Sequence, residues 1–166
     1  MPQPPNIYIV GAQCTGKTTL INNLRGHFDN NRDPPQEPPL LITEIARTAL
    51  REHSFKAADV REATKSGQWF VSDRLVAGPI AYALRYVDQG RAKGLVQSDE
   101  WQELKVRMQN AVVIVCEASQ EVDSWLDVDD WFLEKQEIEY AVLSAGVGNH
   151  QERVQYELRH WSSNKV

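Results

Sequence analysis

The residues most suited to chemistry lie near the start of the chain, in the pattern Gly11-x-x-x-x-Gly16-Lys17-Thr18. Two glycines at this spacing allow a tight turn whose backbone N–H groups point inward at an anion. A helix beginning near Lys17 adds its unpaired amides and the positive end of its dipole. The Lys17 ammonium can reach the terminal phosphates of a nucleotide, and the Thr18 hydroxyl can hold Mg²⁺. The pattern therefore predicts a loop that binds a nucleoside triphosphate with Mg²⁺.

The segments on both sides of this pattern are those that such a loop requires. Residues 7–10, Ile-Tyr-Ile-Val, are an apolar run that predicts a buried strand, and residues 17–28 have the apolar spacing of a helix. The loop between them is expected to surround the phosphates. The predicted nucleotide-binding residues are Gly11, Ala12, Gln13, Cys14, Thr15, Gly16, Lys17, Thr18 and Thr19.

Strand-like and helix-like segments alternate along the rest of the chain. Alternation of this kind favours an α/β fold with a parallel sheet and helices on both faces. Strands are predicted at 40–43, 69–72, 111–115 and 140–143, and helices at 45–53, 57–65, 79–87, 99–109, within 119–135, and at 149–161.

The remaining stretches predict how the chain is organised. Residues 1–166 are expected to form a single domain. Residues 1–5 are expected to be a flexible N-terminus, and the proline-broken stretch 29–39 a mobile loop. Residues 90–94, in which two glycines flank Arg91 and Lys93, are expected to form a solvated basic loop.

Composition disfavours several classes of partner. The formal net charge of -5 argues against non-specific binding to nucleic acid or to an anionic membrane. Cys14 and Cys116 are the only two cysteines, too few for a disulfide scaffold, which favours a reducing intracellular compartment, the cytoplasm or, as the alternative, the nucleus. No apolar stretch approaches the length that membrane insertion needs, and residues 1–5 lack the pattern of a signal peptide.

Acidic residues are predicted to follow the strands at the sheet edge where open α/β folds bind ligands. Asp73 follows the strand 69–72 and precedes Arg74. Its carboxylate can hold Mg²⁺ through water or accept the proton of an attacking hydroxyl, and the alternative for it is a helix N-cap. Arg74 can neutralise phosphate charge. Glu44 can act as a general base, bind a substrate hydroxyl or complement a helix dipole, and Glu117 is a second candidate for the metal-binding acid.

Four segments occur in an order that carries a family resemblance. They are residues 11–19, residues 42–48 (Ile-Thr-Glu-Ile-Ala-Arg-Thr), residues 71–74 (Val-Ser-Asp-Arg) with Tyr82, and residues 111–117. Together they resemble the NadR-like AAA-type family of P-loop domains, which includes nicotinamide riboside kinase domains and eukaryotic proteins linked to TRP-channel trafficking. The resemblance implies a three-layer P-loop NTPase fold whose five parallel strands have the order 2-3-1-4-5. It also implies that Glu44, Arg47, Asp73 and Arg74 border the pocket of the phosphoryl acceptor.

The chain departs from this resemblance at its expected acceptor and lid segments. Residues 53–68 are short where such domains carry a long helical insert, and Gly78 stands where an acid is expected. Kinases of this class also close an arginine-bearing lid over the phosphates between the fourth and fifth strands. No arginine lies between Arg107 and Arg153, and Lys135 is the only lysine there. Arg153 or Arg159 is the alternative source of that charge.

Two functions from different classes fit these residues. The first is a phosphotransferase that uses Mg-ATP and a small nucleoside-like acceptor. Its catalytic residues are Lys17, Asp73, Glu44 and Arg74, its substrate ligands Glu44 and Arg47, and its metal ligands Thr18 and Asp73.

The second function is a nucleotide-binding module with slow hydrolysis or none, which acts through a protein partner or as a homo-oligomer. The chain lacks an Asn-Lys-x-Asp motif for reading guanine, and this favours ATP over GTP in both cases. The sequence does not name the acceptor.

Overall fold

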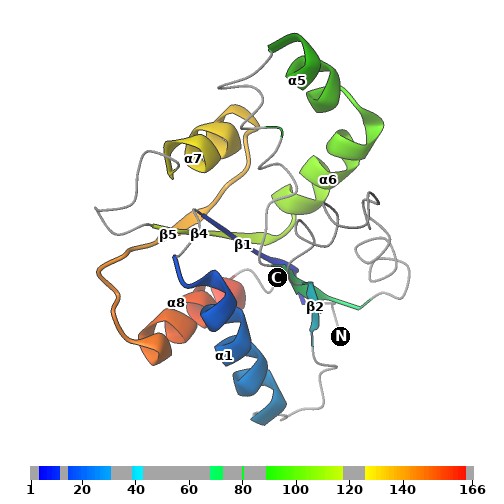
Figure 1. Cartoon of the computed structure of the whole chain (residues 1–166). Coiled ribbons are helices and arrows are strands. Elements are labelled where there is room, and N and C mark those ends of the chain that lie inside the picture. Colours follow the sequence, from blue (N-terminus) through cyan, green and yellow to red (C-terminus); the bar gives the residue numbers. More distant parts are fainter. Residues whose placement is uncertain are drawn as a thin grey trace, which may run out of the picture.

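A single parallel sheet forms the centre of the structure (Figure 1). The structure is a computed structural model and describes residues 4–11, 15–30, 39–42, 68–72, 80, 89–117 and 126–163. Within these residues the strands are β1 (Ile7–Gly11), β2 (Leu40–Ile42), β3 (Phe70–Ser72), β4 (Val112–Cys116) and β5 (Ala141–Leu143). Their order is β2-β3-β1-β4-β5, and each neighbouring pair is parallel. The predicted strand order 2-3-1-4-5 is confirmed.

Helices cover both faces of this sheet (Figure 1). In the described residues they are α1 (Lys17–Asn30), α5 (Gln89–Val96), α6 (Asp99–Gln109), α7 (Leu126–Lys135) and α8 (His150–Ser163). Helices α1 and α8 lie on one face, and α5, α6 and α7 lie on the other, which confirms the three-layer α/β architecture. None of these described helices combines the length and hydrophobicity needed to cross a bilayer. The helices predicted at 45–53, 57–65 and most of 79–87 lie outside the described residues.

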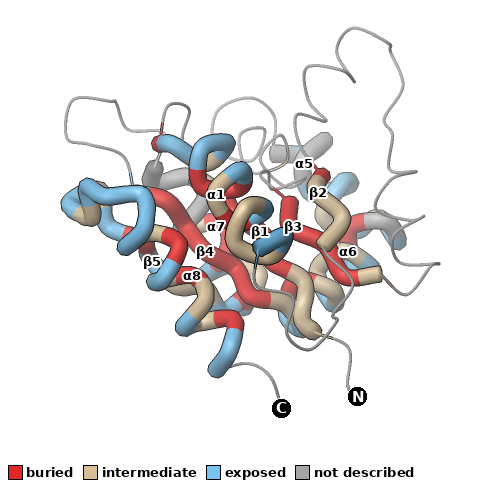
Figure 2. Tube along the Cα trace, turned by 90° about the horizontal axis from the view of Figure 1, so that it is seen from below, coloured by how far each residue is buried: buried red, intermediate tan, exposed pale blue. Residues whose placement is uncertain are grey.

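Alternating side chains of the two central strands supply both halves of the core. Successive residues of a strand point to opposite faces of the sheet. Ile7 and Ile9 of β1 pack in the cluster that contains α1 and α8, whereas Tyr8 and Val10 pack in the cluster that contains α6 and α7. Both β1 and β4 are buried over nearly their whole length (Figure 2). This two-sided burial explains why both strands are apolar throughout, as parallel strands covered on both faces must be.

Side-chain caps define where two of the helices begin. Ser98 precedes α6, and its hydroxyl accepts a hydrogen bond from the Trp101 N–H at 3.2 Å. Asn149 precedes α8, and its Oδ1 accepts from the Glu152 N–H at 3.0 Å. Each cap satisfies an amide of the first turn that has no partner within the helix. Helix α6 spans the predicted range, and α8 extends two residues beyond its predicted end.

Two predictions of loop structure were wrong. Helix α1 continues to Asn30, so residues 29 and 30 are helical and do not belong to the loop predicted at 29–39; residues 31–38 lie outside the described part. The expected solvated loop at 90–94 belongs to helix α5. Its two glycines disfavour a helix, but the alanine and the two basic residues between them and the leucine that follows are good helix formers, and α5 contacts α6.

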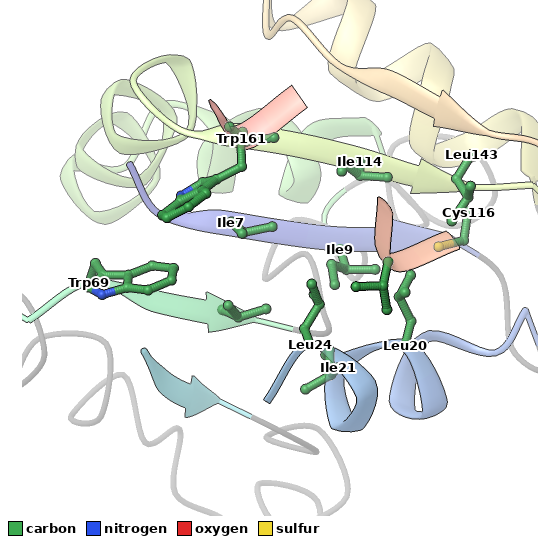
Figure 3. Packing of buried hydrophobic residues seen from close by; sticks show 13 residues of the cluster. Ile7, Ile9, Leu20, Ile21, Leu24, Trp69, Ile114, Cys116, Leu143 and Trp161 are labelled. Atoms are coloured by element: carbon green, nitrogen blue, oxygen red, sulfur yellow. The ribbon is translucent and has the colours of Figure 1, made fainter. Parts of the chain in front are cut away.

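An aromatic cluster joins α8 to α1 and to the start of β3, and Figure 3 shows two of its members, Trp161 and Trp69. The rings of Trp161 and Trp69 stack at 5.1 Å, and Phe28 meets them edge-on at 5.5 and 5.0 Å. The Trp161 Nε1 also donates a hydrogen bond to the Pro5 carbonyl at 3.0 Å. The cluster therefore fixes the helix that follows β5 against the opening of β1, at the sheet edge opposite the carboxyl ends.

We expect Trp161→Ala to lower the free energy of unfolding by about 3–5 kcal/mol, because it removes a buried ring and its hydrogen bond. Urea denaturation measures the change. The control is Val106→Ala on α6, whose side chain is 57% exposed, and which should change stability by less than about 0.5 kcal/mol. Equal effects of the two substitutions would show that the aromatic cluster is not part of the core.

Candidate functional site

The carboxyl ends of the central strands meet where the loop of residues 12–16 leaves the sheet. Gly11 at the end of β1 pairs with Cys116 of β4, and Tyr8 pairs with Ser72 of β3. Parallel pairing therefore places the ends of β1, β3 and β4 at one edge. Ligands of open α/β sheets bind at this edge, where the strand order changes direction. The predicted loop lies at its centre, above β1.

Gly11 begins the loop in a position that only glycine can occupy. Its φ of +131° lies in a region that other residues rarely adopt. A Cβ at this position would lie 2.4 Å from the carbonyl oxygen of Cys116. The chain therefore turns away from β1 in close contact with the backbone of β4, and both the conformation and the contact require glycine.

Gly16 ends the loop and starts helix α1. Its φ is +80°, and its carbonyl accepts the first helical hydrogen bond, from the Leu20 N–H at 3.0 Å. The first-turn amides, including those of Thr18 and Thr19, have no acceptor within the helix. Both threonine residues are exposed, and the first turn contains no acidic residue. An anion here would meet N–H groups and the positive end of the helix dipole without carboxylate repulsion.

Lys17 folds back over the loop. Its Nζ donates to the Gly11 carbonyl at 2.7 Å and to the Thr15 hydroxyl at 3.2 Å. The ammonium therefore lies within the turn that runs from the end of β1 to the start of α1. This places a positive charge where the sequence pattern predicts phosphate.

Arg153 of α8 supports the loop from behind. Its Nη2 donates to the Thr15 carbonyl at 2.9 Å, and its Nη1 makes a long hydrogen bond of 3.5 Å to the Val147 carbonyl. The positive charge of Arg153 also acts on the Cys116 thiol at the end of β4, where it opposes the rise in pKa that burial causes. One guanidinium therefore connects the loop to the segment between β5 and α8.

A buried carboxyl lies one helical turn further along α8. Glu157 is 0% exposed, and neither carboxyl oxygen has a hydrogen-bond partner among the described residues. Burial raises the pKa of Glu157 to about 8, although the nearby Arg153 charge opposes the shift. Burial and then the Glu157 charge raise the pKa of the Cys116 thiol to about 11. At neutral pH the region behind the loop therefore holds a neutral acid, a neutral thiol and a guanidinium.

Glu157 is the site residue that sequence reasoning missed. Val154, Glu157 and Trp161 are spaced as one face of a helix, and all three are buried. An acid within an apolar stripe of helical period was the available signal. Arg153 was named only as an alternative lid residue, and its contact with the loop carbonyl was not predicted.

The structure brings together part of the predicted site. The described residues that meet at the loop are Gly11, Thr15, Gly16, Lys17, Thr18 and Thr19. The predictions for Ala12, Gln13, Cys14, Glu44, Arg47, Asp73 and Arg74 concern residues outside the described part of the chain. Asp73 directly follows Ser72, the last residue of β3, and β3 is a neighbour of β1.

Glu117, the second candidate for the metal-binding acid, is hydrogen-bonded to the segment that follows β5. It follows β4, on the side of β1 away from β3. Its carboxylate accepts hydrogen bonds from the Ser144 hydroxyl at 2.9 Å and the Ala145 N–H at 3.1 Å. These contacts tie the end of β4 to the segment that follows β5. Among the described residues, no group of three His, Cys, Asp or Glu side chains is arranged to hold a metal ion.

Comparisons with known proteins agree with the fold and with the position of the loop in the sequence. A family model described as an AAA domain matches residues 6–66, which include the loop and α1. The fold is similar to that of thymidylate kinase from Ehrlichia chaffeensis, with a TM-score of 0.59, 14% sequence identity, and coverage of 95% of this chain and 98% of that chain. A search of curated protein sequences found no significant match. The chain therefore has the P-loop NTPase fold found in nucleotide kinases.

We expect Gly11→Ala to destabilise the protein by about 1–3 kcal/mol through backbone strain alone, with a further loss from the clash with the Cys116 carbonyl. The matched control is Gly26→Ala within α1, where an added Cβ meets no atom within 4 Å. That control should stabilise the protein by about 0.5–1 kcal/mol, because alanine favours a helix. Urea denaturation measures both variants, and a stable Gly11→Ala protein would contradict the close approach of β1 and β4 at this point.

Proposed function

We propose that the chain binds Mg-ATP at residues 11–19 and transfers the γ-phosphoryl group to a hydroxyl of a small nucleoside-like acceptor. The observation that supports this most directly is the position of Lys17. Its ammonium contacts both ends of a turn that is bounded by two glycines of positive φ and followed by an exposed helix N-terminus. Such a site offers converging N–H groups and a positive charge to the terminal phosphates.

Each further residue has a defined role in this proposal. Mg²⁺ would neutralise charge on the phosphates, and Thr18, exposed in the first turn of α1, fits as its hydroxyl ligand, with Asp73 as the acid that binds it through water. Asp73 or Glu44 would position the acceptor hydroxyl and take its proton. Arg74 would neutralise phosphoryl charge, and Glu44 and Arg47 would bind the acceptor. Most of the rate enhancement in this reaction class comes from such positioning and charge neutralisation.

We also propose that the chain is related to the NadR-like family, prefers ATP and is located in the cytoplasm. A protein partner or a second copy of the chain in a homo-oligomer could supply part of the acceptor site. The nucleotide-kinase fold supports a nucleotide and a small-molecule substrate as ligands.

A non-catalytic nucleotide-binding module is the second candidate, and the position of Lys135 favours it. This residue is the only lysine or arginine between Arg107 and Arg153. It ends helix α7, shortly before β5 begins, so it lies towards the amino ends of the strands, opposite the loop. Its Nζ lies 4.7 Å from the centre of the Trp131 ring. A lid arginine or lysine from this part of the chain is therefore not available to the phosphates.

Calorimetric titration of ATP, ADP and GTP, with and without Mg²⁺, tests nucleotide binding. The proposal expects Mg-dependent ATP binding in the wild type and a loss of at least about a hundredfold in affinity in Lys17→Ala, because a desolvated charged hydrogen bond to phosphate is removed. Lys93→Ala, which truncates an exposed lysine on α5, is the control and should bind as the wild type does. Unchanged affinity in Lys17→Ala would mean that the loop is only structural.

Substitution of Asp73 separates the two candidate functions. The kinase proposal expects Asp73→Asn to keep its affinity for nucleotide within a few-fold and to lose about 10²–10⁴ in turnover, since a general base or metal-binding acid is removed. Phosphoryl transfer from ATP to a panel of nucleosides measures the turnover. Full activity in this variant would exclude Asp73 as that acid. A wild type that binds ATP but transfers phosphate to no acceptor would favour the non-catalytic module.

A further inference from the structure

The contact of Arg153 with the Thr15 carbonyl fixes the direction of an amide in the phosphate-binding loop. In a planar trans peptide the C=O and the following N–H point to opposite sides. Arg153 holds the Thr15 C=O from the side of α8, at 2.9 Å. The N–H of Gly16 must therefore point away from α8. This orientation, with the positive φ of Gly16, is the arrangement in which loop amides face an anion.

Glu157 lies where its charge acts on the same guanidinium. It stands one helical turn from Arg153 on α8, and the two groups interact electrostatically without forming an ion pair. Its oxygens have no hydrogen-bond partner in the described part of the chain. Among the described residues, the Cys116 thiol of β4 interacts electrostatically with Glu157, Arg153 and Lys17. The described residues that α1 buries are apolar.

The protonation state of the Glu157 carboxyl determines the net charge behind the phosphate-binding loop. While Glu157 is neutral, the positive charge of Arg153 reaches the loop without opposition from the buried face of α8; the acid beside it, Glu152, is exposed to solvent. Once Glu157 ionises, a negative charge lies behind the loop and attracts the guanidinium away from the Thr15 carbonyl. Both effects make the loop less favourable for an anion, because little solvent lies between these groups to screen them.

We infer that Arg153 is a positioning residue of the phosphate-binding loop and that Glu157, through Arg153, makes nucleotide binding sensitive to pH, with the neutral acid favouring the bound nucleotide. The inference rests on the proposed nucleotide-binding function. It concerns the back of the loop, so it holds for a kinase and for a non-catalytic nucleotide-binding module alike.

The test is calorimetric titration of Mg-ADP from pH 7 to 9.5 with the wild type, Glu157→Gln, Arg153→Lys and Arg153→Ala. The affinity of the wild type should fall about fivefold as the pH rises through the pKa of Glu157, a loss that corresponds to one partly screened charge. Glu157→Gln, which cannot ionise, should keep the high affinity across the range. Arg153→Ala should bind about tenfold more weakly than the wild type at pH 7 and lose the pH dependence, and Arg153→Lys should recover part of the affinity.

Arg25→Ala is the control, since Arg25 is an exposed arginine in the second half of α1 to which no role at the loop is assigned. It should bind Mg-ADP as the wild type does at every pH. If Arg153→Ala fails to fold, Glu157→Gln and Arg153→Lys still decide the outcome. A pH dependence that persists in Glu157→Gln, or an Arg153→Lys variant indistinguishable from the wild type, would overturn the inference. A wild type that binds no nucleotide would overturn the proposed function itself, and the inference with it.

Urea denaturation across pH gives a second readout that needs no nucleotide. The pKa of Glu157 rises from its ordinary value of 4.5 to about 8 in the folded protein. Between these values the unfolded chain releases the Glu157 proton while the folded chain retains it, so folding stability contributed by this group is lost as the pH rises. The urea midpoint of the wild type should therefore fall relative to that of Glu157→Gln from pH 4.5 to 8. Parallel curves for the two proteins would contradict a buried, neutral Glu157.

Discussion

The close approach of Gly11 to the Cys116 carbonyl is the constraint on which the site depends. The missing side chain lets β1 and β4 stay paired to their last residues, and a Cβ there would lie 2.4 Å from that oxygen. The loop then leaves the sheet at its centre, where Lys17 can join its two ends. Arg153 of α8 holds the Thr15 carbonyl of the same loop, and its charge acts on the Cys116 thiol at the end of β4. Both cations of the site therefore act close to the ends of this strand pair.

The two cations contribute in different ways. Lys17 belongs to the loop itself and can exchange its contacts with backbone and hydroxyl oxygens for contacts with phosphate. Arg153 comes from the far end of the chain and holds a carbonyl, so it shapes the loop and adds charge from behind. The aromatic cluster of Trp161, Trp69 and Phe28 anchors the helix that carries Arg153. The packing of this cluster at the amino ends of the strands thereby helps to hold the charge of Arg153 in place at their carboxyl ends.

Local patterns in the sequence predicted most of the fold and the front of the site. The strands β1 and β4 are apolar runs, and the glycine spacing before Lys17 has a direct conformational cause, so these features needed no tertiary information.

The exact ends of the elements were less predictable from the sequence. Strand β4 ends one residue later than expected, because the pairing of Gly11 with Cys116 extends it. The helix α5 was missed because its glycines outweighed its helix formers in a local assessment. Glu157 was missed because the burial of a charged residue in α8 depends on what packs against it, and only the spacing of Val154 and Trp161 hinted at it.

The most direct test of the phosphate-binding loop is an amide NMR titration of the ¹⁵N-labelled protein with Mg-ADP. Loop amides that bind phosphate should shift far more than any others, so the largest changes should fall on Thr15 to Thr19, with smaller ones around Val147 and Arg153. Residues at the opposite sheet edge, such as Gln109 and His160, should not move. Saturable shifts that centre on that opposite edge, or no shifts at millimolar nucleotide, would contradict the assignment of this loop as the nucleotide site.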